Sequence, residues 1–197
     1  MKTGPPPLLP ILRSHGQGRL LTTLFLDPDR EFTISELADR SGTSVPTATR
    51  EVDRGIEAGI LRGRRVGRNK LVKVDVENPF FEPLAQLLVR AFGPLQLLAA
   101  ALSGIGDLEH VYIFGSWAAR YAGKKGPAPR DLDILVIGDP NRDDIYEAVN
   151  SVERQIGRPV QVTIRTAAQW QAATDDSFLR EVRRRPLVEV PLAAESQ

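Results

Sequence analysis

Two aspartates and a glycine-serine turn are the residues of this sequence best suited to chemistry. Phe114-Gly115-Ser116 comes first, and Asp131 and Asp133 follow on either side of one leucine. Because side chains two positions apart on a strand point to the same face, Asp131 and Asp133 are expected to present two carboxylates together. Carboxylates combined with phosphate oxygens are the usual ligands of Mg²⁺. Gly115 leaves room for a close phosphate, and Ser116 stands where unpaired helix N–H groups receive one.

Alternating apolar strands and amphipathic helices are expected to position these residues. The expected strands cover residues 111–114, 132–137, 160–166 and 187–190, and the expected helices cover residues 116–121, 142–155, 167–173 and 178–184. This alternation favours a mixed sheet with helices packed against it.

A strand, a Gly-Ser turn, a helix and then Asp-x-Asp on the next strand resemble the nucleotidyltransferase superfamily, which includes DNA polymerase beta and the minimal nucleotidyltransferases. The resemblance covers about residues 110–166. It implies that Gly115 and Ser116 bind the triphosphate of a nucleotide, which we expect to be ATP. It also implies that Asp131 and Asp133 are the catalytic pair and bind Mg²⁺. Arg120, one turn into the helix, is a further expected phosphate contact.

The superfamily usually supplies a third carboxylate from a later strand, and this sequence departs from that pattern. In the strand expected beside the aspartate pair, alternation turns Gln161, Thr163 and Arg165 to the polar face. The third-carboxylate position therefore falls to Gln161 or Thr163, and an amide cannot accept a proton at neutral pH. Asp175 and Asp176 are the nearest other acids. Slow catalysis, an acceptor activated in another way and binding without reaction all stay open.

The first half of the chain has a different pattern. Helices are expected over residues 18–26, over residues 33–38 and from residue 44 onward, followed by two strands at residues 61–66 and 70–76 that turn at residues 67–69. Thr33 with Glu36 predicts a capping box, and Pro46 suits the first turn of a helix. This order is typical of a winged helix-turn-helix, and it resembles winged-helix regulators of the arsenic-repressor type. The thiol-based sensing of that family does not transfer, because the chain has no Cys.

Two groups of residues predict contact with double-stranded DNA. Thr47, Arg50 and Arg54 lie opposite the apolar stripe of the third helix, where they suit a major groove. The segment 61–73 carries six cations with no acid between them. These cations are Arg62, Arg64, Arg65, Arg68, Lys70 and Lys73. We expect this hairpin to meet the DNA backbone, and a solvated hairpin is the alternative.

Composition excludes several classes of protein. The absence of Cys excludes disulfide scaffolds, Cys-ligated zinc, iron–sulfur centres and thiol nucleophiles. The first five residues lack the pattern of a signal peptide, and we find no apolar run approaching the roughly 18 residues of a membrane span. We therefore expect a soluble cytoplasmic protein. The run Arg183-Arg184-Arg185 is expected either to cap a helix or to touch phosphate.

The expected fold class is α+β in three parts. Residues 1–78 form the winged helix-turn-helix, residues 79–103 a helical linker, and residues 104–197 a nucleotidyltransferase-like mixed sheet with flanking helices. The linker is strongly apolar and is divided by Gly93-Pro94, so we expect it to pack against the flanking domains and a second copy of the chain. A homodimer would also supply the specificity that one DNA-binding module lacks.

Three functions follow from this organisation. The first is a DNA-binding transcriptional regulator whose second domain binds a nucleoside triphosphate with Mg²⁺ or a partner protein. The resemblance adds that fused proteins of this kind have relatives in toxin–antitoxin systems. The second is an active transferase that moves a nucleoside monophosphate onto a protein or RNA hydroxyl, with the winged helix as adaptor. The third is a nucleotide-sensing pseudoenzyme.

Overall fold

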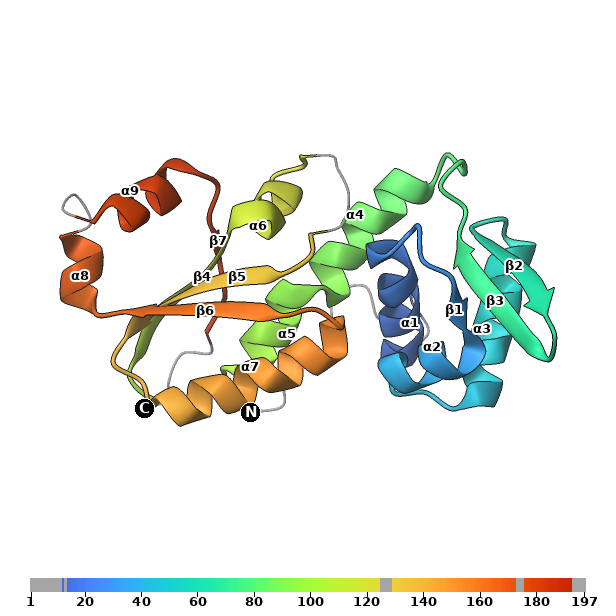
Figure 1. Ribbon diagram of the computed structural model, residues 1–197, viewed down its shortest axis with the longest axis horizontal. Helices are drawn as coiled ribbons and strands as arrows, with labels where there is room; N and C mark the ends of the chain where they lie inside the picture. The colour runs from blue at the N-terminus through green and yellow to red at the C-terminus, as the bar shows by residue number, and fades with distance from the viewer. Residues whose placement is uncertain (1–11, 13, 125–128, 173–175, 193–197) are drawn as a thin grey trace. The chain divides into compact units, whose positions relative to one another are not determined.

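The computed structural model describes residue 12 and residues 14–124, 129–172 and 176–192. The fold is mixed α+β with two small sheets (Figure 1), as the sequence predicted. The chain divides into two compact units, Met1–Gly93 and Pro94–Gln197. This boundary falls inside residues 79–103, the range that the sequence assigned to a linker.

The first unit contains helices and a three-stranded antiparallel sheet of order β1-β3-β2. Its helices are α1 (His15–Leu26), α2 (Ile34–Ser41), α3 (Val45–Glu57) and α4 (Phe81–Phe92), and its strands are β1 (Phe32–Thr33), β2 (Leu61–Val66) and β3 (Asn69–Val74). Val66 pairs with Asn69, so the hairpin turns on the two residues between them. The hairpin is therefore tight, and its tip is Gly67-Arg68.

Local capping explains where α2 and α3 begin. The Thr33 side chain accepts from the Glu36 N–H, and the Glu36 carboxylate accepts from the Thr33 N–H, which is the predicted capping box. That bond to Thr33 lowers the pKa of Glu36. Gly42, in the left-handed region at φ +64°, ends α2, and Ser44 caps α3 two residues later. Gly42 and Ser44 thus determine the short turn between α2 and α3.

The core of the first unit draws on all of its helices. Fully buried side chains include Leu20 and Leu24 on α1, Leu37 on α2, Val52 on α3 and Leu88 on α4. The two-residue strand β1, which sequence periodicity did not predict, joins this core through Phe32 opposite Val72. A strand of two residues is too short to show a period, so tertiary pairing defines it.

The second unit is a four-stranded mixed sheet with helices. Its strands are β4 (Leu108–Phe114), β5 (Leu132–Gly138), β6 (Val160–Arg165) and β7 (Val188–Glu189), and its helices are α5 (Pro94–Ala101), α6 (Gly115–Tyr121), α7 (Arg142–Ile156), α8 (Ala167–Gln171) and α9 (Ser177–Arg184). The strand order is β6-β5-β4-β7, with β5 and β6 parallel and the other pairs antiparallel. The parallel pair needs a crossover helix, which α7 supplies.

Strand β5 carries the aspartate motif through the middle of this sheet. Its residues from Ile134 to Gly138 are all buried. Leu135 and Ile137 share one face with Asp133 and pack against Leu179 and Val182 of α9. Figure 1 shows α8 and α9 together on one side of the sheet and α5 and α7 on the other. The site therefore lies on the face of the sheet that α9 covers.

The predicted helices and strands are present in the structure, and most of their ends differ from the predicted ends by three residues or fewer. Helix α1 begins three residues earlier than residue 18, because the Ser14 hydroxyl accepts from the Gln17 N–H and caps it. Strand β4 begins at Leu108 rather than at residue 111. The predicted helix at residues 167–173 is found as far as Gln171, and its last residue lies outside the described part of the chain.

One segment has the length and composition of a membrane span, so the expectation that no apolar run approaches that length was wrong. Phe81–Ala101 has a mean hydropathy of 1.4 over its most apolar window, of which 39% is buried. The segment comprises α4 and α5, which are separated at Gly93 as the sequence predicted. Core helices of soluble proteins pass the same test, so this segment is weak support for a membrane location. The cytoplasmic location stays an expectation.

Candidate functional site

The Gly-Ser turn lies directly against one carboxylate of the aspartate pair. Gly115 begins α6 immediately after β4, with φ +68°. A Cβ atom at this position would lie 2.5 Å from Asp133 Oδ2. Any other residue would carry a strained backbone and displace the carboxylate, so glycine suits this position. The antiparallel register that pairs Phe114 with Asp133 brings the two motifs together.

The carboxylate of Asp131 acts electrostatically on Asp133. Asp131 immediately precedes β5, and Asp133 is the second residue of the strand. Burial raises the pKa of Asp133, and the negative charge of Asp131 raises it further. A nearby cation would favour the ionised form of Asp133 and so oppose the effects of burial and of the Asp131 charge. The structure thus brings together the two carboxylates that the sequence singled out.

Strand β6 places an amide beside Asp133. In the parallel register, Asp133 pairs with Gln161 and Leu135 pairs with Thr163, and paired residues share a face of the sheet. Gln161 is exposed and Thr163 is half-buried. The position beside Asp133 therefore holds a neutral amide. This amide can donate a hydrogen bond or bind a cation weakly through its oxygen, but it cannot accept a proton.

Of the two other acids that the sequence offered, Asp176 has another role. Asp176 caps α9, where its carboxylate accepts from the N–H groups of Phe178 and Leu179. The same carboxylate lies 3.8 Å from Arg165 Nε. Asp175 lies outside the described residues. The Asp176 carboxylate is thus occupied in starting a helix.

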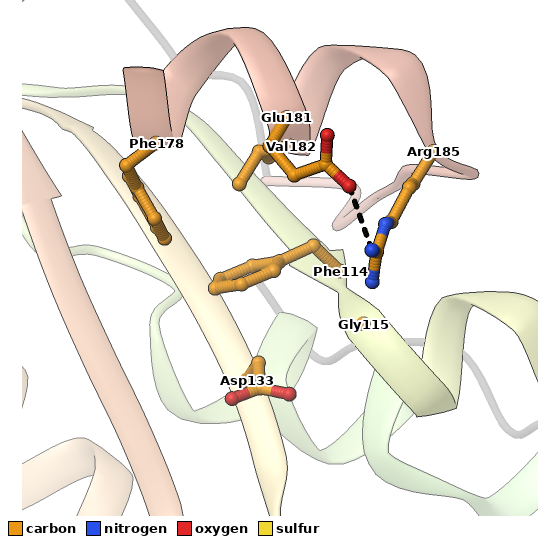
Figure 2. A pocket seen from close by; sticks show the side chains of 7 residues that line it. All are labelled: Phe114, Gly115, Asp133, Phe178, Glu181, Val182 and Arg185. Atoms are coloured by element: carbon orange, nitrogen blue, oxygen red, sulfur yellow. Dashed lines mark ion pairs between the residues drawn. The ribbon is translucent and has the colours of Figure 1, made fainter. Parts of the chain in front are cut away.

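A pocket of about 240 Å³ opens beside Gly115 and Asp133. It is lined by Phe114, Gly115, Asp133, Phe178, Glu181, Val182 and Arg185 (Figure 2). Phe114 and Phe178 meet edge to face with ring centroids 5.8 Å apart and form its apolar wall. Arg185 Nη2 and Glu181 Oε1 form an ion pair at 2.6 Å. The pocket therefore presents one carboxylate on β5 and, on the side of α9, a carboxylate paired with the guanidinium of the C-cap residue Arg185.

The two remaining predicted phosphate contacts lie on α6. Ser116 is exposed in the first turn of this seven-residue helix, and Arg120 is half-buried in the last. Trp117 and Tyr121 on the same helix are buried, and their rings lie 6.4 Å apart between centroids. Ser116 directly follows the glycine that touches Asp133, whereas Arg120 stands one turn further along.

The two carboxylates are compatible with a Mg²⁺ ion that also binds oxygen atoms of a ligand. Mg²⁺ in proteins is commonly held by one or two carboxylates together with phosphate oxygens and water. Asp131 and Asp133 meet the first requirement. In the part of the chain that the structure describes, no group of three or more His, Cys, Asp or Glu side chains is placed to hold a metal by itself. A cation here could share its coordination with phosphate oxygens and water.

Helix α3 exposes the residues predicted to read DNA. Arg50 and Arg54 are exposed, and Thr47 is half-buried. Arg50 Nη2 lies 3.5 Å from Thr47 Oγ1, and Arg54 pairs with Glu51. Ala48 and Val52 are fully buried on the opposite face. The amphipathic division that the sequence predicted is therefore present.

The hairpin divides its cations between two faces. The first, the α3 side of the hairpin, contains Gly63, Arg65 and Lys70. A Cβ at Gly63 would lie 2.8 Å from Ile56 Cδ1, so this side faces α3 and its flanking residues. Arg65 pairs with Lys70 in the register, and Lys70 Nζ lies 2.6 Å from Asp53 on α3. The α3 side of the hairpin thus adjoins the exposed face of α3.

On the opposite face of the hairpin, two of the three cations, Arg62 and Arg64 but not Lys73, are held in ion pairs. Arg62 Nε lies 2.8 Å from Asp75, and a second bond joins Arg62 to Glu77. Arg64 Nε lies 2.7 Å from Glu31, whose pKa this bond lowers. Two of the predicted DNA contacts therefore already hold acids of the same unit, which follows from the register of the hairpin and the position of β1.

Sequence reasoning missed these acidic partners and most of the pocket. The hairpin register would have placed Asp75 near Arg62, because Leu61 pairs with Val74. Glu31 could not have been found, since β1 was not predicted. On α9, the spacing of Phe178, Glu181, Val182 and Arg185 at i, i+3, i+4 and i+7 marks one helix face. The sequence shows this helix face but does not show that the face lies against Gly115 and Asp133.

Comparison of the chain with known protein families finds no matching family, and no curated protein matches its sequence.

Proposed function

We propose that the first unit is a winged helix-turn-helix and that the protein is a transcriptional regulator that binds double-stranded DNA. The observation that carries the proposal is the exposed α3, which bears Arg50 and Arg54 and adjoins the α3 side of the hairpin through the Lys70–Asp53 pair. A short capped turn between α2 and α3 and a sheet of order β1-β3-β2 support it. An exposed helix beside a basic hairpin suits a groove and the adjoining phosphates.

The test is selection of bound fragments from a random duplex library, followed by titration of the selected duplex at several salt concentrations. Arg50→Ala is expected to weaken binding by roughly 1–3 kcal/mol if it contacts a base edge, because a bidentate contact is lost. Arg142→Ala, which removes one exposed positive charge from α7, is the matched control and should bind as the wild type does. Failure to enrich any duplex would contradict the proposal.

For the second unit we propose a nucleotidyltransferase-like fold that binds a nucleoside triphosphate, most simply ATP, with Mg²⁺ through Asp131 and Asp133. The contact between Gly115 and Asp133 supports this function, because it sets a turn without a side chain against a carboxylate. When bound, Mg²⁺ would supply charge neutralisation for the phosphates. The residues of the chain would orient the nucleotide, with Ser116 beside the turn.

Binding without turnover is favoured over transfer by one observation. In a transfer, the acceptor hydroxyl attacks the α-phosphorus, pyrophosphate leaves, and the hydroxyl proton must go to a base. Gln161, which stands in register with Asp133, cannot accept that proton. We therefore propose a nucleotide-responsive regulator and keep transfer of a nucleoside monophosphate to a protein or RNA hydroxyl as the second candidate.

Calorimetric titration with ATP, GTP, CTP and UTP in the presence of Mg²⁺ tests this part. Binding that Asp131→Ala abolishes establishes the site, and pyrophosphate measured in the same samples separates transfer from binding. Absence of binding by all four nucleotides would contradict the proposal.

We also propose that the DNA-binding form is a homodimer. Phe80 is 64% exposed and Leu87 is 39% exposed at neighbouring positions of the first unit, which is a high exposure for large apolar side chains. Sedimentation equilibrium is expected to give twice the mass of the chain, and a monomer at the concentrations that bind DNA would contradict it.

A further inference from the structure

The pocket beside Asp133 is lined by two carboxylates, Asp133 and Glu181, and by one guanidinium, Arg185. Asp133 projects from β5, and Arg185 extends from the end of α9 toward the Phe114–Gly115 turn (Figure 2). A triphosphate carrying a divalent cation has the complementary pattern, since its cation seeks carboxylate and its outer oxygens seek guanidinium. We propose that Arg185 is a phosphate-binding residue of this pocket and that Glu181 competes with the phosphates for it. This inference rests on the proposed nucleotide-binding function of the second unit.

The structure distinguishes Arg185 from its neighbours in the Arg183-Arg184-Arg185 run. Arg183 lies over the ring of Trp170 at 4.0 Å and donates to the Trp170 carbonyl oxygen, so its guanidinium is held on α8. Arg184 is exposed and does not line the pocket. Arg185, at the C-cap of α9, lines the pocket. Of the two roles that the sequence allowed for this run, the pocket assigns phosphate contact to Arg185.

Glu181 holds the guanidinium in the absence of phosphate. It lies four residues before Arg185 and also lines the pocket. The side chains of Arg185 and Glu181 are 65% and 53% exposed, and such solvent-exposed pairs are weak. A planar guanidinium forms stronger, bidentate bonds to phosphate oxygens. Arg185 is therefore expected to exchange Glu181 for a phosphate when a triphosphate enters, and the freed Glu181 charge opposes that exchange.

Two substitutions in this pair are expected to change nucleotide affinity in opposite directions. Arg185→Gln should weaken binding of the Mg²⁺-triphosphate about tenfold, because one charge-assisted contact is lost. Glu181→Gln should strengthen it roughly two- to fivefold, because the competing carboxylate and its repulsion are removed. The full chain is titrated with ATP, GTP, CTP and UTP in Mg²⁺, and Arg184→Gln is the control for loss of one positive charge on the same helix. Thermal unfolding of each variant confirms folding.

The outcomes separate this inference from the function on which it rests. Opposite shifts with an unchanged Arg184→Gln support the exchange. If the wild type binds and Asp131→Ala does not, but both pair variants bind as the wild type does, Arg185 is not a phosphate contact while the nucleotide site stands. If Arg184→Gln weakens binding as much as Arg185→Gln does, the effect is general charge and the inference is wrong. If the wild type binds no nucleotide, the proposed function itself fails.

Discussion

The carboxyl group of Asp133 is half-buried beside a second carboxylate, and both conditions raise its pKa above 3.8. Ionisation is therefore less favourable in the folded chain than in the unfolded chain. The resulting loss of stability is absent below about pH 3.8, where both states are protonated, grows as the pH rises from there toward the raised folded pKa, and is complete above that pKa and therefore at neutral pH. A carboxylate whose charge destabilises the fold is expected at a binding site, where a bound cation compensates that charge.

We predict that Asp133→Asn raises the Tm of the second unit by about 2–4 °C at pH 7 and abolishes nucleotide binding. The gain in Tm should shrink as the pH falls toward 4. Asp139→Asn is the control, because this exposed aspartate follows the other end of β5. Calorimetry at several pH values measures the effect. A destabilised Asp133→Asn, or a gain that does not depend on pH, would show that the carboxylate stabilises the fold.

Gly115 offers a test of the contact between the turn and the carboxylate. Gly115→Ala is expected to cost about 1–2 kcal/mol from its left-handed backbone and to displace Asp133, so that nucleotide affinity falls. Gly123→Ala is the matched control, since Gly123 has φ +89° and nothing within 4 Å of its would-be Cβ. Both variants should lose a similar amount of stability through their left-handed backbone, and Gly115→Ala should lose more through its contact with Asp133. Equal nucleotide affinity in the two variants would argue against a role for the Gly115–Asp133 contact.

At the scale of the element, the hairpin is the clearest case of a local pattern altered by its surroundings. Its sequence shows six cations without an acid, yet the register and β1 bring acids to one face. Arg62 and Arg64 pair with those acids, whereas no acidic partner is found for Arg65 or Arg68 within the described residues. Lys70 on the α3 side also pairs with Asp53, so the cations without an acidic partner among the described residues are Arg68 at the tip, Arg65 on the α3 side and Lys73 on the opposite face.

We predict that Arg65→Ala weakens DNA binding and lowers the salt dependence of the affinity by about one unit of slope. Arg64→Ala, its neighbour on the opposite face, is expected to leave both nearly unchanged because Glu31 already binds it. Fluorescence anisotropy with the selected duplex over a salt series measures the two effects. Equal losses in the two variants would mean that the whole hairpin, and not one face, meets the DNA.

At the scale of the whole molecule, the chain has a separate apolar core in each unit. The large core cluster of the first unit lies entirely before Gly93, and the sheet core of the second is built on Ile134 and its neighbours. Leu24 and Ile134 are both fully buried. The stability of each unit should therefore depend on its own core.

We predict that Leu24→Ala and Ile134→Ala each cost about 2–5 kcal/mol in different unfolding transitions. Leu24→Ala should lower the transition that reports DNA binding, and Ile134→Ala the one that reports nucleotide binding. Scanning calorimetry with and without each ligand assigns the transitions. A single transition lowered equally by both substitutions would show that the two units unfold together.

The sequence by itself determined the helices and all strands but β1, because each of these elements carries its own local signals, whereas β1 has only two residues and depends on pairing with β3. Thr33 and Glu36 start α2, Ser44 starts α3, and Gly93 separates α4 from α5. It also determined that Asp131 and Asp133 come close together, since residues two apart on a strand share a face.

The tertiary structure decided the contacts between segments that are distant in the sequence. Pairing of β4 with β5 set Gly115 against Asp133, and pairing of β5 with β6 set Gln161 beside it. The packing of α9 on the sheet brought Arg185 to the same pocket. Strand register and helix packing follow from burial of the whole apolar surface rather than from any local pattern, and this is why the sequence alone left them open.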